Sequence, residues 1–232
     1  MGINSIITDK EKGVRKMANI LTIIVGTRNR ADHVLALYED LKKQTFQDFN
    51  VLVMDDVSEV EEVNKLKSIK DERFSFFSNP PPHRLAGDLT FIEHLKRAIN
   101  KGPKYIYNMH DDMKINSSDL LEKLVNCLEE NEKYGAVAPT IYDGKGVMSW
   151  GPGIVKVRMG KEFNMNESYM VRTKCFKEMG LVCEEFIYYG SEYYIFNWLR
   201  NNGYQTKILG AVNITHLNIH IYNYYLTIRI LI

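Results

Sequence analysis

Two pairs of adjacent aspartates carry the clearest chemical signal in this chain of 232 residues. Asp111 and Asp112 follow His110 at the end of the strand-like segment 105–109, and Asp55 and Asp56 follow the apolar run 51–54. Mg²⁺ and Mn²⁺ prefer hard oxygen ligands, often one or two carboxylates together with substrate phosphates. The first pair therefore indicates a divalent cation site that could hold a diphosphate, and the second could hydrogen-bond a base or a ribose. Both pairs also fit turns or helix caps, because Asp often begins tight turns.

Two further side chains have types suited to the same chemistry. Glu192 follows Gly190 and Ser191 at the start of a predicted helix. A carboxylate within reach of a hydroxyl group can accept its proton as a general base, although an acid at a helix start is also favoured by the helix dipole alone. His216 lies near the end of a predicted strand, where a histidine is either a packed residue or a metal ligand. Neither glycine-rich phosphate motif, GxGxxG or GxxxxGK[ST], occurs, so dinucleotide and P-loop sites lose support.

Strand-like and helix-like patterns alternate along the chain and would position these residues. A continuous apolar run at 20–25 and further strand-like segments at 51–54, 74–77, 105–109, 135–141 and 205–209 predict strands, whereas helical spacing predicts helices at 34–41, 59–69, 89–99, 120–128, 174–179 and 192–202. The Gly-rich stretch 143–166 predicts loops and short strands. Such alternation indicates an α/β fold with a mainly parallel central sheet flanked by helices. Ligands bind beyond the carboxyl ends of such strands, and polar clusters follow residues 25, 54 and 109.

The composition is that of an ordinary globular protein, with 45% hydrophobic and 25% charged residues. A formal net charge of +1 gives no electrostatic case for a nucleic-acid partner. No apolar run reaches the roughly 18–20 residues of a transmembrane helix, which leaves peripheral membrane association open. The three cysteines show no CxxC pair, so we expect reduced thiols and a cytoplasmic location. We expect a flexible leader over residues 1–18 and a separate tail over 217–232.

Three segments resemble glycosyltransferase family 2, whose members have the GT-A fold. The first comprises ILTIIVGTRNR at 20–30 and QTFQDFNVLVMDDVS at 44–58, similar to the opening strand, the loop after it and the "DDxS" strand end of that family. The second is YIYNMHDDM at 105–113, similar to the D-x-D region, and the third runs from 169 to 216 and resembles the acceptor-side segment. His110 replaces the common first Asp of D-x-D, and Val57 replaces the common Gly of "DDGS". The order and spacing of the segments make the resemblance more specific than any one of them.

The resemblance implies a role for each candidate residue. Asp56 would contact the nucleobase with Asp55 beside it, and Asp112 would bind the metal. Gly26, Thr27 and Arg28 would form the loop around the base, and Asp111 would lie near the ribose and the metal. Glu192 would be the general base, and His216 would be a further metal ligand.

The resemblance also implies an activity. The single GT-A-like domain would span 19–216, with a nucleotide-binding half at 19–113 and an acceptor half at 114–216. The enzyme would move a sugar from a nucleotide-diphosphate sugar to an acceptor hydroxyl, with inversion and with Mn²⁺ or Mg²⁺ as cofactor. The acceptor, whether a saccharide, a lipid-linked molecule or a protein, stays open. Two alternatives remain: a nucleotidyltransferase of similar architecture, and a catalytically inactive binding module with this fold.

Overall fold

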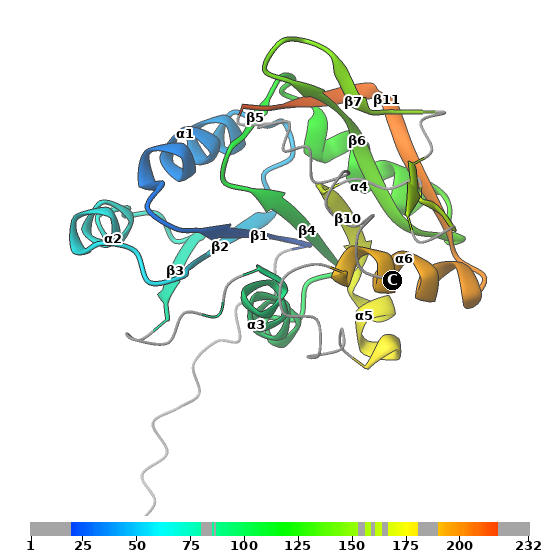
Figure 1. Ribbon diagram of the computed structural model, residues 1–232, viewed down its shortest axis with the longest axis horizontal. Coiled ribbons are helices and arrows are strands. Elements are labelled where there is room, and N and C mark those ends of the chain that lie inside the picture. The colour runs from blue at the N-terminus through cyan, green and yellow to red at the C-terminus, as the bar shows by residue number, and fades with distance from the viewer. Residues whose placement is uncertain are drawn as a thin grey trace, which may run out of the picture.

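The computed structural model describes residues 20–79, 85, 87–152, 156–158, 161–163, 167–180 and 190–217. The predicted leader at 1–18 lies outside the described residues, as does the predicted tail beyond Leu217. A nine-stranded sheet with the strand order β3-β2-β1-β4-β10-β6-β11-β5 forms the centre of the described part, with β7 paired to β6 (Figure 1).

The amino-terminal half of the sheet is parallel, as the alternating patterns predict. Its strands are β1 (Leu21–Thr27), β2 (Phe49–Asp55), β3 (Phe74–Ser78) and β4 (Tyr105–His110), and β1 pairs with both β2 and β4. The connecting helices are α1 (Ala31–Lys42), α2 (Val60–Lys67) and α3 (Gly87–Asn100). The chain adds β2 and β3 on one side of β1 and then β4 on the other, so the strand order reverses beside β1.

The carboxyl-terminal half makes the sheet mixed. The strand β10 (Tyr169–Arg172) runs antiparallel between β4 and β6 (Tyr134–Asp143), and β11 (Gln205–His216) runs parallel to β6. Two further strands complete this half of the sheet, namely β5 (Met113–Ile115) antiparallel to β11 and β7 (Met148–Trp150) antiparallel to β6. The strands β8 (Lys156–Arg158) and β9 (Lys161–Phe163) form a separate antiparallel pair. Its helices are α4 (Leu120–Glu130), α5 (Thr173–Met179) and α6 (Ser191–Asn201).

Helices cover both faces of the sheet, which explains why central strands such as β1 and β2 are buried along most of their length. One core contains residues of α1, α2 and α4, and the other contains residues of α3, α5 and α6 (Figure 1). Successive residues of a strand point to opposite faces, so Ile23 of β1 packs in the first core and Ile24 in the second. Each is 0% exposed, and the two layers hold β1 rigidly behind the loop that follows it.

Three elements differ from the sequence prediction. The strand β11 extends past the predicted end at residue 209 to His216, with a register shift between Leu209 and Asn213. The strands β5 and β10 were not predicted, because three or four residues are too few to show a period. By contrast, α5 ends as expected at Gly180, whose φ of 78° is the left-handed conformation that Gly adopts readily.

Candidate functional site

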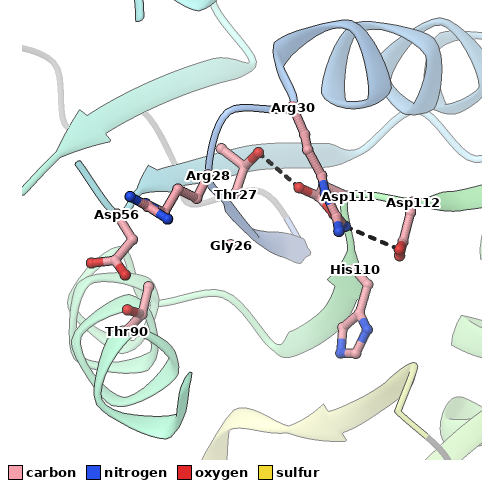
Figure 2. A pocket seen from close by; sticks show the side chains of 9 residues that line it. All are labelled: Gly26, Thr27, Arg28, Arg30, Asp56, Thr90, His110, Asp111 and Asp112. Carbon is pink, nitrogen blue, oxygen red and sulfur yellow. Dashed lines mark hydrogen bonds and ion pairs between the residues drawn. The ribbon is translucent and has the colours of Figure 1, made fainter. Parts of the chain in front are cut away.

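The carboxyl ends of β1, β2 and β4 meet at one cavity of about 450 Å³, a volume typical of small-ligand pockets (Figure 2). The register explains the meeting, because Gly26 on β1 lies opposite both Met54 on β2 and His110 on β4. The cavity lies where the strand order reverses, which is where α/β sheets bind ligands. It is lined by Gly26, Thr27, Arg28, Arg30, Asp56, Thr90, His110, Asp111 and Asp112.

Asn29 joins the two loops at the edge of this cavity. Its backbone N–H donates to Ser58 Oγ at 2.7 Å, and its side-chain oxygen accepts from the backbone N–H of Glu59 at 2.8 Å. The φ of Asn29 is 53°, a conformation in which Asn is enriched. The loop after β1 and the loop after β2 are therefore fixed to each other before any ligand arrives.

A network of hydrogen bonds holds the acidic pair after β4. Asp111 is 6% exposed and Asp112 is 5% exposed, so both carboxylates need partners. Thr27 Oγ1 donates to Asp111 Oδ2 at 2.8 Å, and Arg30 Nη1 donates to Asp111 Oδ1 at 3.2 Å and to Asp112 Oδ2 at 3.1 Å (Figure 2). Burial raises the pKa of Asp111, and the charge of Asp112 adds to this effect, while Thr27 and Arg30 oppose it. A single guanidinium thus bridges two buried acids.

His216 holds the other side of Asp112. Its Nε2 lies 3.0 Å from Asp112 Oδ1, and its Nδ1 lies 3.6 Å from Glu167 Oε2. Burial alone would raise the pKa of Asp112, but the hydrogen bond from His216 and nearby positive charge lower it to about 2. Burial likewise opposes protonation of His216, yet the bond and charge of Asp112 raise its pKa. Asp112 therefore stays ionised and has electrostatic partners on both oxygens.

The two acids after β2 have different environments. Asp56 lines the cavity, and its Oδ1 accepts from Asn79 Nδ2 at 3.0 Å and from the backbone N–H of Leu85 at 2.9 Å. Asp55 is 0% exposed and does not line the cavity formed by the described residues. Its oxygens accept from the backbone N–H of Ser58 at 3.1–3.2 Å, and its Oδ2 accepts from Ser78 Oγ at 2.7 Å. The carboxylate of Asp55 thus holds the turn that presents Asp56.

Val57 occupies a strained position in that turn. Its φ is 62°, in the left-handed region that is rare for a β-branched residue. This is the position at which the family resemblance expects Gly, and the backbone here has the conformation that Gly adopts without a steric penalty. The hydrogen bonds that the Ser58 N–H donates to the Asp55 carboxylate span the strained residue and help to hold it.

Three residues that line the cavity were not among the predicted site residues. Arg30 lies in the predicted loop and could have been chosen for its charge, and His110 was noted only as a departure from D-x-D. Thr90 comes from α3, whose contribution has no motif, because the helix approaches the loop only in the folded chain (Figure 2). Its Cγ2 would lie 4.0 Å from a Cβ at Gly26, so the helix packs closely on the end of β1.

The structure brings most of the predicted site residues together. Gly26, Thr27, Arg28, Asp56, Asp111 and Asp112 line the cavity, and His216 contacts Asp112 directly. Glu192 lies in the first turn of α6, after Gly190 with a φ of 134°, and its side chain is half-buried. It does not line the cavity that the described residues form.

Comparison of the sequence with known protein families identifies the family of this chain. The family described as Glycosyl transferase family 2 matches residues 22–189, which include the cavity-lining loops and both aspartate pairs. The chain belongs to glycosyl transferase family 2. The resemblance seen in the sequence is therefore confirmed, and the enzyme class is that of a glycosyltransferase.

Solved structures of glycosyltransferases share the fold. TarS residues 1–349 from S. aureus, in complex with UDP, matches with a TM-score of 0.63 and 18% identity over 84% of this chain and 60% of that one. The mannosyltransferase PcManGT from Pyrobaculum calidifontis, in complex with GDP-Man and Mn²⁺, gives a TM-score of 0.66 with 13% identity over 91% and 61%. GalNAc-T7 with UDP, GalNAc and Mn²⁺ gives 0.65 with 12% identity over 88% and 44%. The fold of this member of the family is the mixed α/β fold of GT-A glycosyltransferases.

The chain spans about 60% of the TarS 1–349 and PcManGT chains that it resembles. No curated protein matches it in sequence. Within the described part of the chain, each helix is too short or too polar to cross a bilayer.

Proposed function

We propose that this glycosyltransferase transfers a sugar from a nucleotide-diphosphate sugar to an acceptor hydroxyl, with inversion at the anomeric carbon. The observation that carries the proposal is the convergence of Asp56, two arginines and the pair Asp111 and Asp112 on one cavity at the strand reversal. A nucleoside diphosphate has a base and two phosphates joined through a ribose, and these residues offer partners for the base and for the phosphates.

The polar groups divide along the cavity by chemistry. The carboxylate of Asp56 suits the N–H donors of a base, whereas the guanidinium group of Arg30 suits phosphate oxygens. Figure 2 places Arg28 and Asp56 on one side of Gly26 and the pair Asp111 and Asp112 on the other. We assign the base to the Asp56 side and the diphosphate to the side of Arg30 and Asp112.

The donor set around Asp112 fits a divalent cation. Its buried carboxylate is ionised, its neighbour Asp111 adds a second carboxylate, and the His216 imidazole contacts it at 3.0 Å. We propose that Asp112 and His216 hold Mn²⁺ or Mg²⁺, which the Mn²⁺ bound in the structures of PcManGT and GalNAc-T7 supports. Such a cation would offset the negative charge that develops on the leaving diphosphate.

The acceptor hydroxyl needs a group that removes its proton. We propose Glu192 for this role, because a half-buried carboxylate in the first turn of α6 combines partial desolvation with a fixed backbone. The proton would pass to the Glu192 carboxylate while the acceptor oxygen attacks the anomeric carbon and the nucleoside diphosphate leaves. Membership of the family favours sugar transfer over nucleotidyl transfer. Measured turnover of the donor would distinguish an enzyme from a catalytically inactive binding module.

A thermal-shift screen of nucleoside diphosphates and nucleotide sugars, with and without Mn²⁺, tests the proposal. A ligand present at 100 times its Kd stabilises the folded state by about 2.7 kcal/mol, which corresponds to roughly 5–10 °C for a chain of this size. We expect one base to give such a shift and nucleosides without phosphate to give far less. If no nucleoside diphosphate or nucleotide sugar changes the melting temperature under either condition, the proposal is wrong.

A further inference from the structure

Sheet register brings a carboxylate of the acceptor half against the end of β4. Tyr169 on β10 lies opposite Asn108 on β4, and the strands are antiparallel. Glu167, two residues before Tyr169, therefore lies opposite His110, two residues after Asn108. Asn108 Nδ2 donates to the backbone oxygen of Glu167 at 3.3 Å, which fixes the segment to β4.

A third strand contributes the second imidazole. His216 ends β11 opposite Met113 of β5, and the backbone N–H of the next residue, Leu217, donates to the carbonyl oxygen of Asp112 at 2.9 Å. The rings of His110 and His216 stand 5.8 Å apart between centroids at an interplanar angle of 76°. One potential ligand atom from each of His110, Glu167 and His216 lies within 4.8 Å of the other two.

The charge around this cluster favours a cation. In the ion pairs of the described residues, Arg30 contacts Asp111 and Asp112, and His216 contacts Asp112 and Glu167, with the His110 ring beside that of His216. With neutral imidazoles, the group has two formal negative charges, which a divalent ion would balance. Glu167 has a side chain that is 44% exposed, so it has room to adjust around an ion.

We propose that His110 and Glu167 join Asp112 and His216 in a mixed imidazole and carboxylate site that binds a first-row transition ion before any nucleotide is present. The role of this ion in sugar transfer rests on the proposed function, because the same cation would face the donor diphosphate. Binding without nucleotide does not depend on it, since His110, Glu167 and His216 already offer three ligand atoms within 4.8 Å of one another and Asp112 lies beside His216.

The ligand types determine which ion the site prefers. Mg²⁺ takes oxygen ligands in a near-ideal octahedron and usually keeps several waters, whereas imidazole suits Zn²⁺, Cu²⁺, iron and nickel. Two imidazoles should therefore shift the preference away from Mg²⁺. Affinity should rise along the Irving–Williams order from Mn²⁺ through Co²⁺ to Zn²⁺.

The test is a titration of the full, chelator-treated chain with Mn²⁺ in the absence of nucleotide, followed by the electron paramagnetic resonance signal of free Mn²⁺. We expect Glu167→Gln and His110→Asn each to weaken Mn²⁺ binding by at least about 10-fold, because even supporting residues of metal sites contribute 10–100-fold. The matched control is Glu122→Gln, whose carboxylate instead accepts from Thr45 Oγ1. It should bind Mn²⁺ as the wild type does.

A second variant tests selectivity without removing a ligand. His110→Asp replaces a nitrogen ligand by an oxygen ligand, so the ratio of Mn²⁺ to Mg²⁺ affinity should fall at least several-fold while an ion is still bound. Circular dichroism of each variant confirms folding, and because His110→Asp keeps a ligand, it remains informative if His110→Asn does not fold.

The inference is overturned if wild-type protein binds Mg²⁺ as tightly as Mn²⁺, or if folded Glu167→Gln and His110→Asp both bind like wild type. Failure of the proposed function gives a different result. In that case the chain would bind Mn²⁺ with the expected sensitivity to Glu167→Gln, yet no nucleotide sugar would bind, and the metal site would stand.

Discussion

Replacing Asp55 by alanine should destabilise the fold rather than remove a nucleotide contact. The carboxylate is 0% exposed, and it accepts from the backbone N–H of Ser58 and from Ser78 Oγ. A hydrogen bond to a charged group contributes about 1.5–3 kcal/mol, and the N–H of Ser58 and the hydroxyl of Ser78 are only partly buried, so water can replace part of the loss. We expect Asp55→Ala to lower the free energy of unfolding by about 2–4 kcal/mol.

Urea unfolding measures this change through the transition midpoint at unchanged slope. The control is the adjacent variant Asp56→Asn, which keeps Oδ1 as an acceptor for Asn79 and Leu85 but removes the charge that faces the cavity. We expect Asp56→Asn to unfold within about 1 kcal/mol of the wild type and to bind the nucleotide found by the screen at least about 10-fold more weakly. If Asp55→Ala keeps its stability but loses nucleotide affinity, Asp55 contacts the nucleotide directly and our interpretation of the turn is wrong.

Three further predictions concern the same loops. Val57→Gly should stabilise the protein by about 0.5 kcal/mol, because relief of about 1–2 kcal/mol of left-handed strain exceeds the entropy cost of Gly. A urea midpoint below that of the wild type would contradict this prediction. Asp112→Asn, or a chelator, should abolish most sugar transfer, and His216→Ala should have a smaller effect; a fully active Asp112→Asn would exclude the proposed cation clamp. Arg30→Gln should lower the stability of the metal-free protein by about 1–2 kcal/mol, since Asp111 and Asp112 lose their shared cation, and should weaken diphosphate binding; calorimetry and unfolding check both parts.

The elements that build the nucleotide side were predictable because their patterns are local. The buried run that became β1 and the helical spacing of Val34, Leu37 and Leu41 in α1 can be read from the chain alone. The strand β10 could not, because four buried residues carry no period, and its place between β4 and β6 depends on pairing partners far away in sequence.

The same contrast between local patterns and contacts formed only on folding applies to the residues of the site. Thr27, Asp56 and Asp112 could be predicted because each lies two or three residues after a predicted strand, and parallel strands bring such ends together. Thr90 and Glu167 were missed because a helix face and a segment just before a short antiparallel strand acquire their neighbours only on folding. Asp55 was grouped with Asp56, although adjacent residues at a strand end face different sides. The predicted cytoplasmic location and the division into two halves at residue 113 stay predictions.

The measurement that tests the central claim most directly is sugar transfer by wild type and Glu192→Gln, with the nucleotide sugar that the screen identifies. A general base acts in the transition state, so its loss should lower turnover and spare donor affinity. We predict that wild type releases nucleoside diphosphate in the presence of Mn²⁺, and that Glu192→Gln binds the donor normally but turns over at least about 10²-fold more slowly. Equal turnover by the two proteins would show that another group is the base, and a wild type that binds the donor but never releases nucleoside diphosphate would contradict the account of this site as catalytic.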